Sequence, residues 1–280
     1  ISYQMEFAWD CTAVFWKSED INTIATVQYL PSADSGVFII DNNSNIIIGN
    51  IEIQEQTPAN ANGGNPLAGV YVTNANANTV WPGQWSNALY GVYVELSDDI
   101  TIGWGVSDNP YGHYVINSDD INVGTPWPIT LPWNNNTGIY VWYSTNVTID
   151  ADPRDNTSMG THVYQSTWVW VRSRYTALNE SPGTLMENVY NGRVNGGHGG
   201  NLWYGLKIIN SENITGTMSW PTLNDPNFYG QNTSNNIGVD SHWFIIDSST
   251  GIYLTGIYAS FNDWYGLYIT NSETILNTIL

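Results

Sequence analysis

The stretch "WYGLYITNSETI" at residues 264–275 has a near twin, "WYGLKIINSENI", at 203–214, and nine of the twelve letters agree. Four further copies occur at 89–100, 110–121, 136–147 and 159–169. When the six copies are aligned on their glycine, each has serine six residues later and Ile or Val nine residues later. Looser copies fill most of the remaining chain, and most steps between copies are 20 to 26 residues long. Self-similarity of this kind indicates a repeat architecture.

Each copy contains a short strand, a polar turn and a second short strand. Apolar and polar residues alternate in the first strand, as in Val92-Tyr93-Val94, which is typical of a strand with one buried face. A propeller blade needs four strands in ~40–45 residues, and the dense leucine pattern of a leucine-rich repeat is absent. A repeat of about 22 residues instead predicts one coil of a parallel β-helix, with coils stacked ~4.8 Å apart.

The repeated phrase, a glycine followed by an alternating strand and an Asn-Ser turn, resembles the coil repeat of right-handed parallel β-helix proteins. These are the pectate-lyase-like superfamily and the carbohydrate-binding or sugar-hydrolase repeats of many archaeal and bacterial surface proteins. The resemblance covers roughly residues 12–280. It implies the fold but not one function, because the same fold hosts lyases, hydrolases, phage tailspikes, adhesins and structural proteins.

We therefore predict an all-β fold, a right-handed parallel β-helix of about ten to eleven coils, formed by a single domain at residues 1–280. Insertions are expected near 52–67 and 221–240, where the steps between copies are longer. Residues 94, 115, 141, 163, 208 and 269 should line one internal column, and His113 should be a core residue. The glycine is expected to make the bend before the strand, and the serine to form the next turn through bonds to nearby backbone.

The composition favours an extracellular protein. The chain carries 25 Asp and Glu against 6 Lys and Arg, which argues against nucleic acid or an anionic membrane surface as a partner. No apolar run approaches the ~18 residues of a membrane span. The single cysteine excludes an internal disulfide. Scarce lysine with abundant Asn, Tyr, Thr and Ile is similar to the secreted proteins of thermophilic, acid-dwelling archaea, and the first residue, which is not Met, suggests a processed chain.

Seven sequons of the form N-x-[ST] are candidate glycosylation sites, several of them at predicted turns where a glycan could project. They are Asn42, Asn135, Asn146, Asn156, Asn179, Asn213 and Asn232.

Paired acids recur at one position of two consecutive coils. Asp98-Asp99 and Asp119-Asp120 lie 21 residues apart, so a β-helix stacks them about one strand spacing from each other. Carboxylates this close raise one another's pKa unless a cation lies between them. The stack is therefore a candidate calcium site, the only cofactor that the sequence suggests. The alternative is a solvated turn.

A second charged group follows the coil at 136–147. Asp150 and Asp152 lie about one coil before Arg172 and Arg174. The calcium-dependent lyases of this fold resemble this arrangement in kind, with carboxylates that hold calcium and an arginine that takes the proton. A salt-bridge cluster on the surface explains the same residues, and it is favoured because no stricter lyase motif accompanies them.

An aromatic residue recurs two positions after the glycine. The neighbours of each one point inward, so these rings should point outward and stack into an exposed ladder. Exposed rings suit sugar faces or contacts with another protein, although β propensity and stacking between coils also favour them. The ladder consists of Tyr71, Tyr93, Tyr114, Tyr140 and Tyr268.

These features predict an extracellular or cell-surface glycoprotein without enzymatic activity, structural or adhesive, that assembles with itself into a filament or sheath. Its partners would be further copies of the chain and polysaccharide. Two alternatives stay open. One is a polysaccharide lyase or glycoside hydrolase of the pectate-lyase-like fold, and the other is a carbohydrate-binding or virion receptor-binding module.

Overall fold

The computed structural model of the 280-residue chain describes residues 5–6, 14–16, 25–29, 38–42, 46–55, 68–85, 89–103, 106, 109–124, 135–173, 179–180, 182–196, 201, 204–217, 242–257, 267–273 and 276–279. These residues form 23 strands and, within the described ranges, no helix. The strands belong to two parallel sheets of eleven and twelve strands, and from β3 onward the chain alternates between the sheets.

The first sheet, sheet A, contains in spatial order β1 (Met5–Glu6), β4 (Phe38–Asp41), β6 (Ala68–Thr73), β8 (Tyr90–Glu95), β10 (Tyr111–Ile116), β12 (Thr137–Trp142), β14 (Thr161–Tyr164), β16 (Thr184–Glu187), β18 (Tyr204–Ile209), β20 (His242–Asp247) and β22 (Leu267–Thr270). The second sheet, sheet B, contains β2 (Val14–Trp16), β5 (Ile46–Glu55), β7 (Asn76–Trp85), β9 (Asp98–Ile102), β11 (Asp119–Val123), β13 (Thr145–Asp150), β15 (Thr167–Ser173), β17 (Arg193–Gly196), β19 (Thr215–Thr217), β21 (Tyr253–Ile257) and β23 (Leu276–Ile279), and β3 (Ala25–Tyr29) also pairs with β5.

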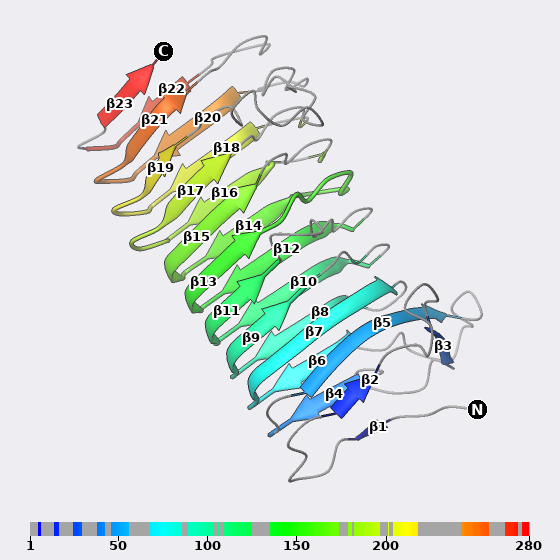
Figure 1. Ribbon diagram of the computed structural model, residues 1–280. Helices are drawn as coiled ribbons and strands as arrows, with labels where there is room; N and C mark the ends of the chain where they lie inside the picture. The colour runs from blue at the N-terminus through cyan, green and yellow to red at the C-terminus, as the bar shows by residue number, and fades with distance from the viewer. Residues whose placement is uncertain are drawn as a thin grey trace, which may run out of the picture.

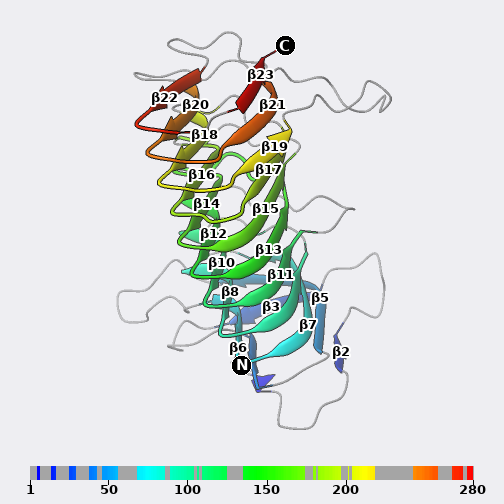
Figure 2. The same ribbon diagram turned by 90° about the vertical axis from the view of Figure 1, so that its left-hand side faces the viewer.

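The coils stack into a parallel β-helix, as predicted from the repeat (Figure 1). The stack runs from the N-terminal strands, in blue, to the C-terminal strands, in red, and Figure 2 shows the two sheets side by side along its length. Of the expected insertion at 52–67, residues 52–55 belong to β5. The rest of that segment and the whole of 221–240 lie outside the described residues. No helix in the described residues is long and apolar enough to cross a membrane.

The predicted internal column is present. Its members pair from coil to coil in register: Val94, Val115, Val141, Val163, Met186, Ile208, Ile246 and Ile269. All of them are buried except Ile269, at the last described coil, which is 42% exposed. His113 is fully buried and pairs with Val92 and Ile139, so it is the core residue that the repeat predicts.

The sharp turn between the two sheets depends on positive backbone φ angles. In the coil of Ser97, the residue before the serine, Leu96, has φ 49° and the second residue after it, Asp99, has φ 51°. The repeat glycine does not make the bend, contrary to expectation, since Gly91 lies inside β8. Glycine is required there because the neighbouring coil is so close: a Cβ at Gly91 would lie 2.6 Å from the carbonyl oxygen of Gly112.

The repeated serine forms two kinds of hydrogen bond at each turn, one within its own coil and one to the previous coil. The hydroxyl of Ser118 donates to the carbonyl of Ile116 in its own coil at 2.8 Å and accepts from the backbone N–H of Ser97 in the previous coil at 3.3 Å. Ser144 repeats the pattern with Trp142 and Ser118. The local bonds confirm the predicted role of the serine in the turn, and the bonds between coils form a buried serine ladder.

A second ladder, of asparagine, is formed by residues that lie just before the sheet A strands in the sequence. The side-chain oxygens of Asn135, Asn156, Asn179 and Asn201 each accept from the backbone N–H of the ladder residue in the previous coil, at 3.1–3.2 Å. The first of these N–H groups belongs to Asn109, and all five asparagines are buried. Turns that enter the core therefore keep their backbone groups satisfied, as buried polar groups require.

Candidate functional site

Three of the seven predicted glycosylation sites lie inside the molecule. Asn135, Asn156 and Asn179 are at most 1% exposed, and each donates its side-chain amide to a buried acceptor of the asparagine ladder or the backbone. A glycan cannot be attached to these amides in the folded chain, so the predictions at these three positions were wrong. The physical reason is that the tripeptide occurs in a ladder position, where the asparagine serves the core.

The remaining sequons differ in accessibility. Asn42 and Asn213 are exposed at turns and Asn146 is exposed at the start of β13, each with φ between 52° and 55°. Asn232 lies outside the described residues. Three sites therefore stay open to modification within the part of the chain that the structure describes.

The acidic stack has the predicted geometry. Asp98 and Asp119 pair in register on β9 and β11, and they are exposed, as are Asp99 and Asp120. Asp120 accepts a hydrogen bond from the side chain of Asn146. Among the described residues, no three His, Cys, Asp or Glu side chains lie close enough together to hold a metal ion. Calcium takes roughly six to eight oxygens, so the calcium site stays a prediction that would need further ligands.

The second charged group forms a surface ion pair. Arg172 on β15 hydrogen-bonds to Asp150 on β13, its partner in register, and this bond raises the pKa of the guanidinium. Asp152 is buried and accepts a hydrogen bond from Ser173 at 3.3 Å. Arg174 lies outside the described residues. The described members are thus engaged in contacts between neighbouring coils.

The tyrosine ladder is present but is not an exposed surface. Tyr71, Tyr93, Tyr114 and Tyr140 follow one another on sheet A with ring centroids 5.0–5.3 Å apart; the last three rings stack, and the ring of Tyr71 is tilted by 60° to that of Tyr93. Tyr268 is separated from them by other residues of its column, His162 among them.

Rings of a neighbouring column cover part of this ladder, so the expectation of full exposure was wrong. The ring of Tyr90 lies 4.7 Å from that of Tyr114, which is only 8% exposed. Tyr71 and Tyr93 both donate their hydroxyls to Glu95. Burial and Glu95 raise the pKa of Tyr71 to about 12, so this phenol stays a hydrogen-bond donor. The ladder therefore belongs mainly to the packing of the coils.

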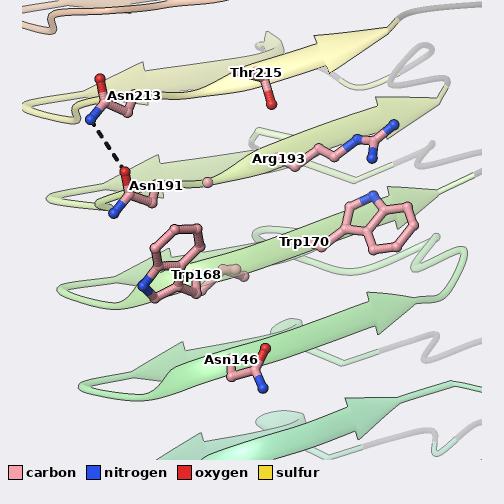
Figure 3. A pocket seen from close by; sticks show the side chains of 9 residues that line it. Asn146, Trp168, Trp170, Asn191, Arg193, Asn213 and Thr215 are labelled. Atoms are coloured by element: carbon pink, nitrogen blue, oxygen red, sulfur yellow. Dashed lines mark hydrogen bonds between the residues drawn. The ribbon is translucent and has the colours of Figure 1, made fainter.

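A pocket of about 430 Å³, which the sequence analysis did not predict, lies on the outer face of sheet B (Figure 3). Two tryptophans of one strand form its centre: Trp168 is 62% exposed, and Trp170 is partly buried. They point to the same side of β15 because the residue between them, Val169, points into the core. The sequence signal is the alternation in "TWVWVR", residues 167–172, which places bulky rings at successive outward positions.

Polar side chains from neighbouring coils surround the two rings. Figure 3 shows Asn146 one coil before them, Asn191 and Arg193 on the next coil, and Asn213 and Thr215 on the coil after that. Asn213 donates to Asn191 at 3.2 Å. The pocket thus presents flat rings beside amide, hydroxyl and guanidinium groups that can donate hydrogen bonds.

Arg193 is the charged residue of this lining. Its guanidinium carbon lies 4.8 Å from the centroid of the Trp170 ring, a cation–π contact. Among the described residues it forms no ion pair with a carboxylate, in contrast to Arg172. The buried indole N–H of Trp170 also finds no acceptor in the described part of the chain. The described lining contains no carboxylate and no histidine, so it can stack and donate but lacks a general acid or base.

No protein-family model matches the chain, and a search of curated proteins found no match either. Solved structures of β-helix proteins do match. The A-module of mannuronan C-5 epimerase AlgE4 from Azotobacter vinelandii is 12% identical, with 91% of this chain and 75% of that chain covered and a TM-score of 0.42.

Two phage proteins match at similar levels. Tailspike protein 3 of bacteriophage CBA120 is 11% identical, with coverage of 91% and 51% and a TM-score of 0.32. Tailspike protein 2 of an Escherichia coli O157:H7 bacteriophage, CAB120, is 10% identical, with coverage of 91% and 34% and a TM-score of 0.34. The likeness is one of fold alone.

Proposed function

We propose that the chain is an extracellular, non-enzymatic, adhesive surface protein that binds a saccharide in the pocket around Trp168 and Trp170. The observation that carries this proposal is the pair of outward tryptophans flanked by hydrogen-bond donors from three coils. Sugars present apolar ring faces edged by hydroxyls, so a site with flat rings and several fixed donors suits them.

The charges of the pocket favour binding over catalysis. A lyase or glycosidase of this fold would need an acid or base beside the bound sugar, and the described lining offers none. The described candidates Asp150 and Arg172 are paired with each other and are not part of that lining, although the Arg172 guanidinium carbon lies 5.3 Å from the centroid of the Trp170 ring. Arg193 supplies donors suited to a hydroxyl or a carboxylate of the ligand.

Glycosylation fits this proposal best at Asn42. Asn146 and Asn213 line the pocket, so a glycan attached to either one would fill the space that the saccharide needs. We therefore expect mass spectrometry of the native protein to find glycan on Asn42 and none on Asn146 or Asn213. A fully occupied Asn146 would contradict a free pocket.

The test of the proposal is affinity electrophoresis in gels that contain dextran, xylan, alginate or polygalacturonate. The wild type should be retarded by at least one of them. Trp168→Ala should weaken that interaction about tenfold or more, because a central aromatic anchor carries a large part of binding energy.

Tyr268→Ala provides the matched control, since it removes an exposed aromatic ring (42% exposed) from the other sheet. It should behave like the wild type. If no polysaccharide retards the wild type, or if both variants bind equally well, the proposal fails.

A second candidate function is self-association, which one observation favours. Ile269 is 42% exposed, although the seven residues before it in the same column are buried. Any further coil stacked on Ile269 would cover it, and we propose that a second copy of the chain supplies that coil. Light scattering and electron microscopy should then detect oligomers or filaments in the wild type and fewer in Ile269→Glu, whereas a monomeric wild type at high concentration would refute the assembly.

A further inference from the structure

A second aromatic pair lies on the turn edge of the coil next to Trp168. The rings of Trp142 and Tyr143 stack with centroids 5.2 Å apart and an interplanar angle of 23°. Tyr143 is 51% exposed, so one face of this pair is open to solvent. Trp142 also holds the next coil, because its indole N–H donates to the side chain of Gln165 at 3.5 Å.

The register places this pair beside the pocket. Trp142 pairs with Tyr164, and Thr145 pairs with Thr167, so the turn that carries Tyr143 packs directly against the turn that leads to Trp168. Along the stack the two coils are separated by one strand spacing, ~4.8 Å. Around the turn, Trp168 lies three residues beyond Gln165, which occupies the position of Tyr143 in the next coil, and this offset spans at most ~10 Å of chain.

The surface between the two aromatic groups is polar. The hydroxyls of Thr145 and Thr167, at the start of β13 and β15, lie 3.2 Å apart in an exposed contact. A ligand that passes from one aromatic group to the other would therefore meet hydroxyl groups on the way, a sequence of contacts that suits alternating sugar faces and edges.

The backbone at both aromatic residues adopts a conformation that bulky side chains rarely take. Tyr143 has φ 48° and Trp168 has φ 53°. At the same positions of neighbouring coils the chain uses Asn117 and Asn191, which tolerate positive φ better, although Gln165 and Leu96 also adopt it at the position of Tyr143. For a bulky residue this conformation costs roughly 1–2 kcal/mol, and such strain persists where the surrounding structure or function requires it.

We propose that Trp142 and Tyr143 form a second subsite for the same ligand, which is a polysaccharide strand that crosses the turn edge from the Trp168 pocket to Tyr143. This inference rests on the proposed function and extends it: the ligand is a chain of several sugar units, not a single sugar. The Trp168 pocket holds one unit, and Tyr143 stacks on another.

The test is isothermal titration with size-fractionated oligosaccharides of roughly two to eight units, a range chosen to run from chains too short to reach both subsites to chains that cover both. The oligosaccharides are prepared from whichever of the four polysaccharides retards the wild type. Affinity of the wild type should rise with length until the chain spans both subsites. Tyr143→Asn, which uses the residue that other coils carry at this position, should leave the affinity for the shortest oligomer unchanged. It should lower the affinity for the longest oligomer about three- to tenfold, the effect of one aromatic contact.

Two controls separate the outcomes. Leu96→Asn changes an exposed residue at the same turn position, with φ 49°, two coils away, and it should match the wild type at every length. Trp168→Ala should weaken binding at every length. If Tyr143→Asn equals the wild type at all lengths, or is weaker by the same factor at all lengths, the second subsite is refuted while the pocket stands. If the wild type binds none of the oligomers, the proposed function fails with it.

Discussion

The asparagine ladder makes a strong prediction about stability at Asn156. Its side-chain oxygen accepts the backbone N–H of Asn135 at 3.1 Å, and its amide donates to the side chain of Asn179 at 2.8 Å. Asn156→Ala removes both bonds and leaves the N–H of Asn135 buried without this acceptor. An orphaned buried group costs ~1–3 kcal/mol, and the lost amide bond adds ~1 kcal/mol. We expect a loss of about 2–4 kcal/mol in the free energy of unfolding.

The assay is urea unfolding followed by tryptophan fluorescence and far-ultraviolet circular dichroism. Stability should fall at an unchanged m-value, since the surface exposed on unfolding stays the same. Coils of a solenoid contact only their neighbours, so hydrogen exchange should show the loss concentrated around Asn156.

Two matched controls isolate the ladder. Asn136→Ala changes the exposed neighbour of a ladder residue, and it should shift stability by less than ~0.5 kcal/mol. Ser158→Ala destroys the sequon at Asn156 without removing a ladder side chain, so it should also leave stability nearly unchanged. A loss below ~1 kcal/mol for Asn156→Ala, or a glycan on Asn156, would refute the reasoning.

Three further outcomes follow from the described contacts. Asp119→Asn should raise the melting temperature in calcium-free buffer, because it removes a like charge directly opposite Asp98. If the acidic stack holds calcium, added calcium should raise the melting temperature of the wild type and not that of the variant. Equal responses of the two proteins to calcium would leave the stack a solvated turn. Burial lowers the pKa of His162, and Glu187 opposes this shift. The neutral form of His162 therefore contributes stability that is complete above the ordinary pKa of ~6.5 and is lost as pH falls below it. Between pH 7.5 and 5.5, roughly the window around that value, His162→Gln should lose less stability than the wild type, and parallel plots of stability against pH for the two proteins would contradict this. Arg193→Gln should weaken binding of a carboxylate-bearing oligosaccharide more than that of a neutral one in titrations at matched salt, and an equal loss would show that the guanidinium recognises hydroxyls only.

The sequence predicts the inner surface of this protein well. Positions such as Val94 and Val141 recur with the repeat, and a period of two assigns them to one face of a strand. The repeat alone could not reveal the role of the glycine, because Gly91 is required by the close approach of the next coil and not by a bend. Contacts between coils decide such positions, and they become visible only when the register is known.

The sequons show the same limit. Asn156 and Asn146 both start an N-x-[ST] tripeptide, yet Asn156 is buried in the asparagine ladder and Asn146 is exposed at the start of β13. What distinguishes a buried sequon from an exposed one is its position relative to the repeat, not the tripeptide itself. Asn135 lies three residues before the repeat glycine of its coil, and Asn201 lies four residues before the repeat glycine of its coil. An asparagine at that phase of the repeat belongs to the core.

The pocket escaped prediction because its parts come from different coils. Trp168 and Trp170 are visible in the sequence as outward residues, but their neighbours Asn191 and Arg193 are 23 residues further along and meet them only through the parallel register. A short motif cannot carry such a site. Repeats aligned coil by coil, with only the outward positions compared, would have exposed it.

The division between inward and outward residues also explains why the binding proposals can be tested cleanly. The inward columns repeat from coil to coil and hold the fold, whereas the pocket depends on residues that break the repeat, such as Trp168 at a position that Asn146 and Asn191 occupy in adjacent coils. Because a solenoid couples each coil mainly to its neighbours, a change at one outward ring should leave the distant coils intact. Loss of saccharide binding in Trp168→Ala with retained β circular dichroism would therefore report on the site itself. Loss of both together would mean that the ring serves the stack, and the pocket would then be a by-product of packing.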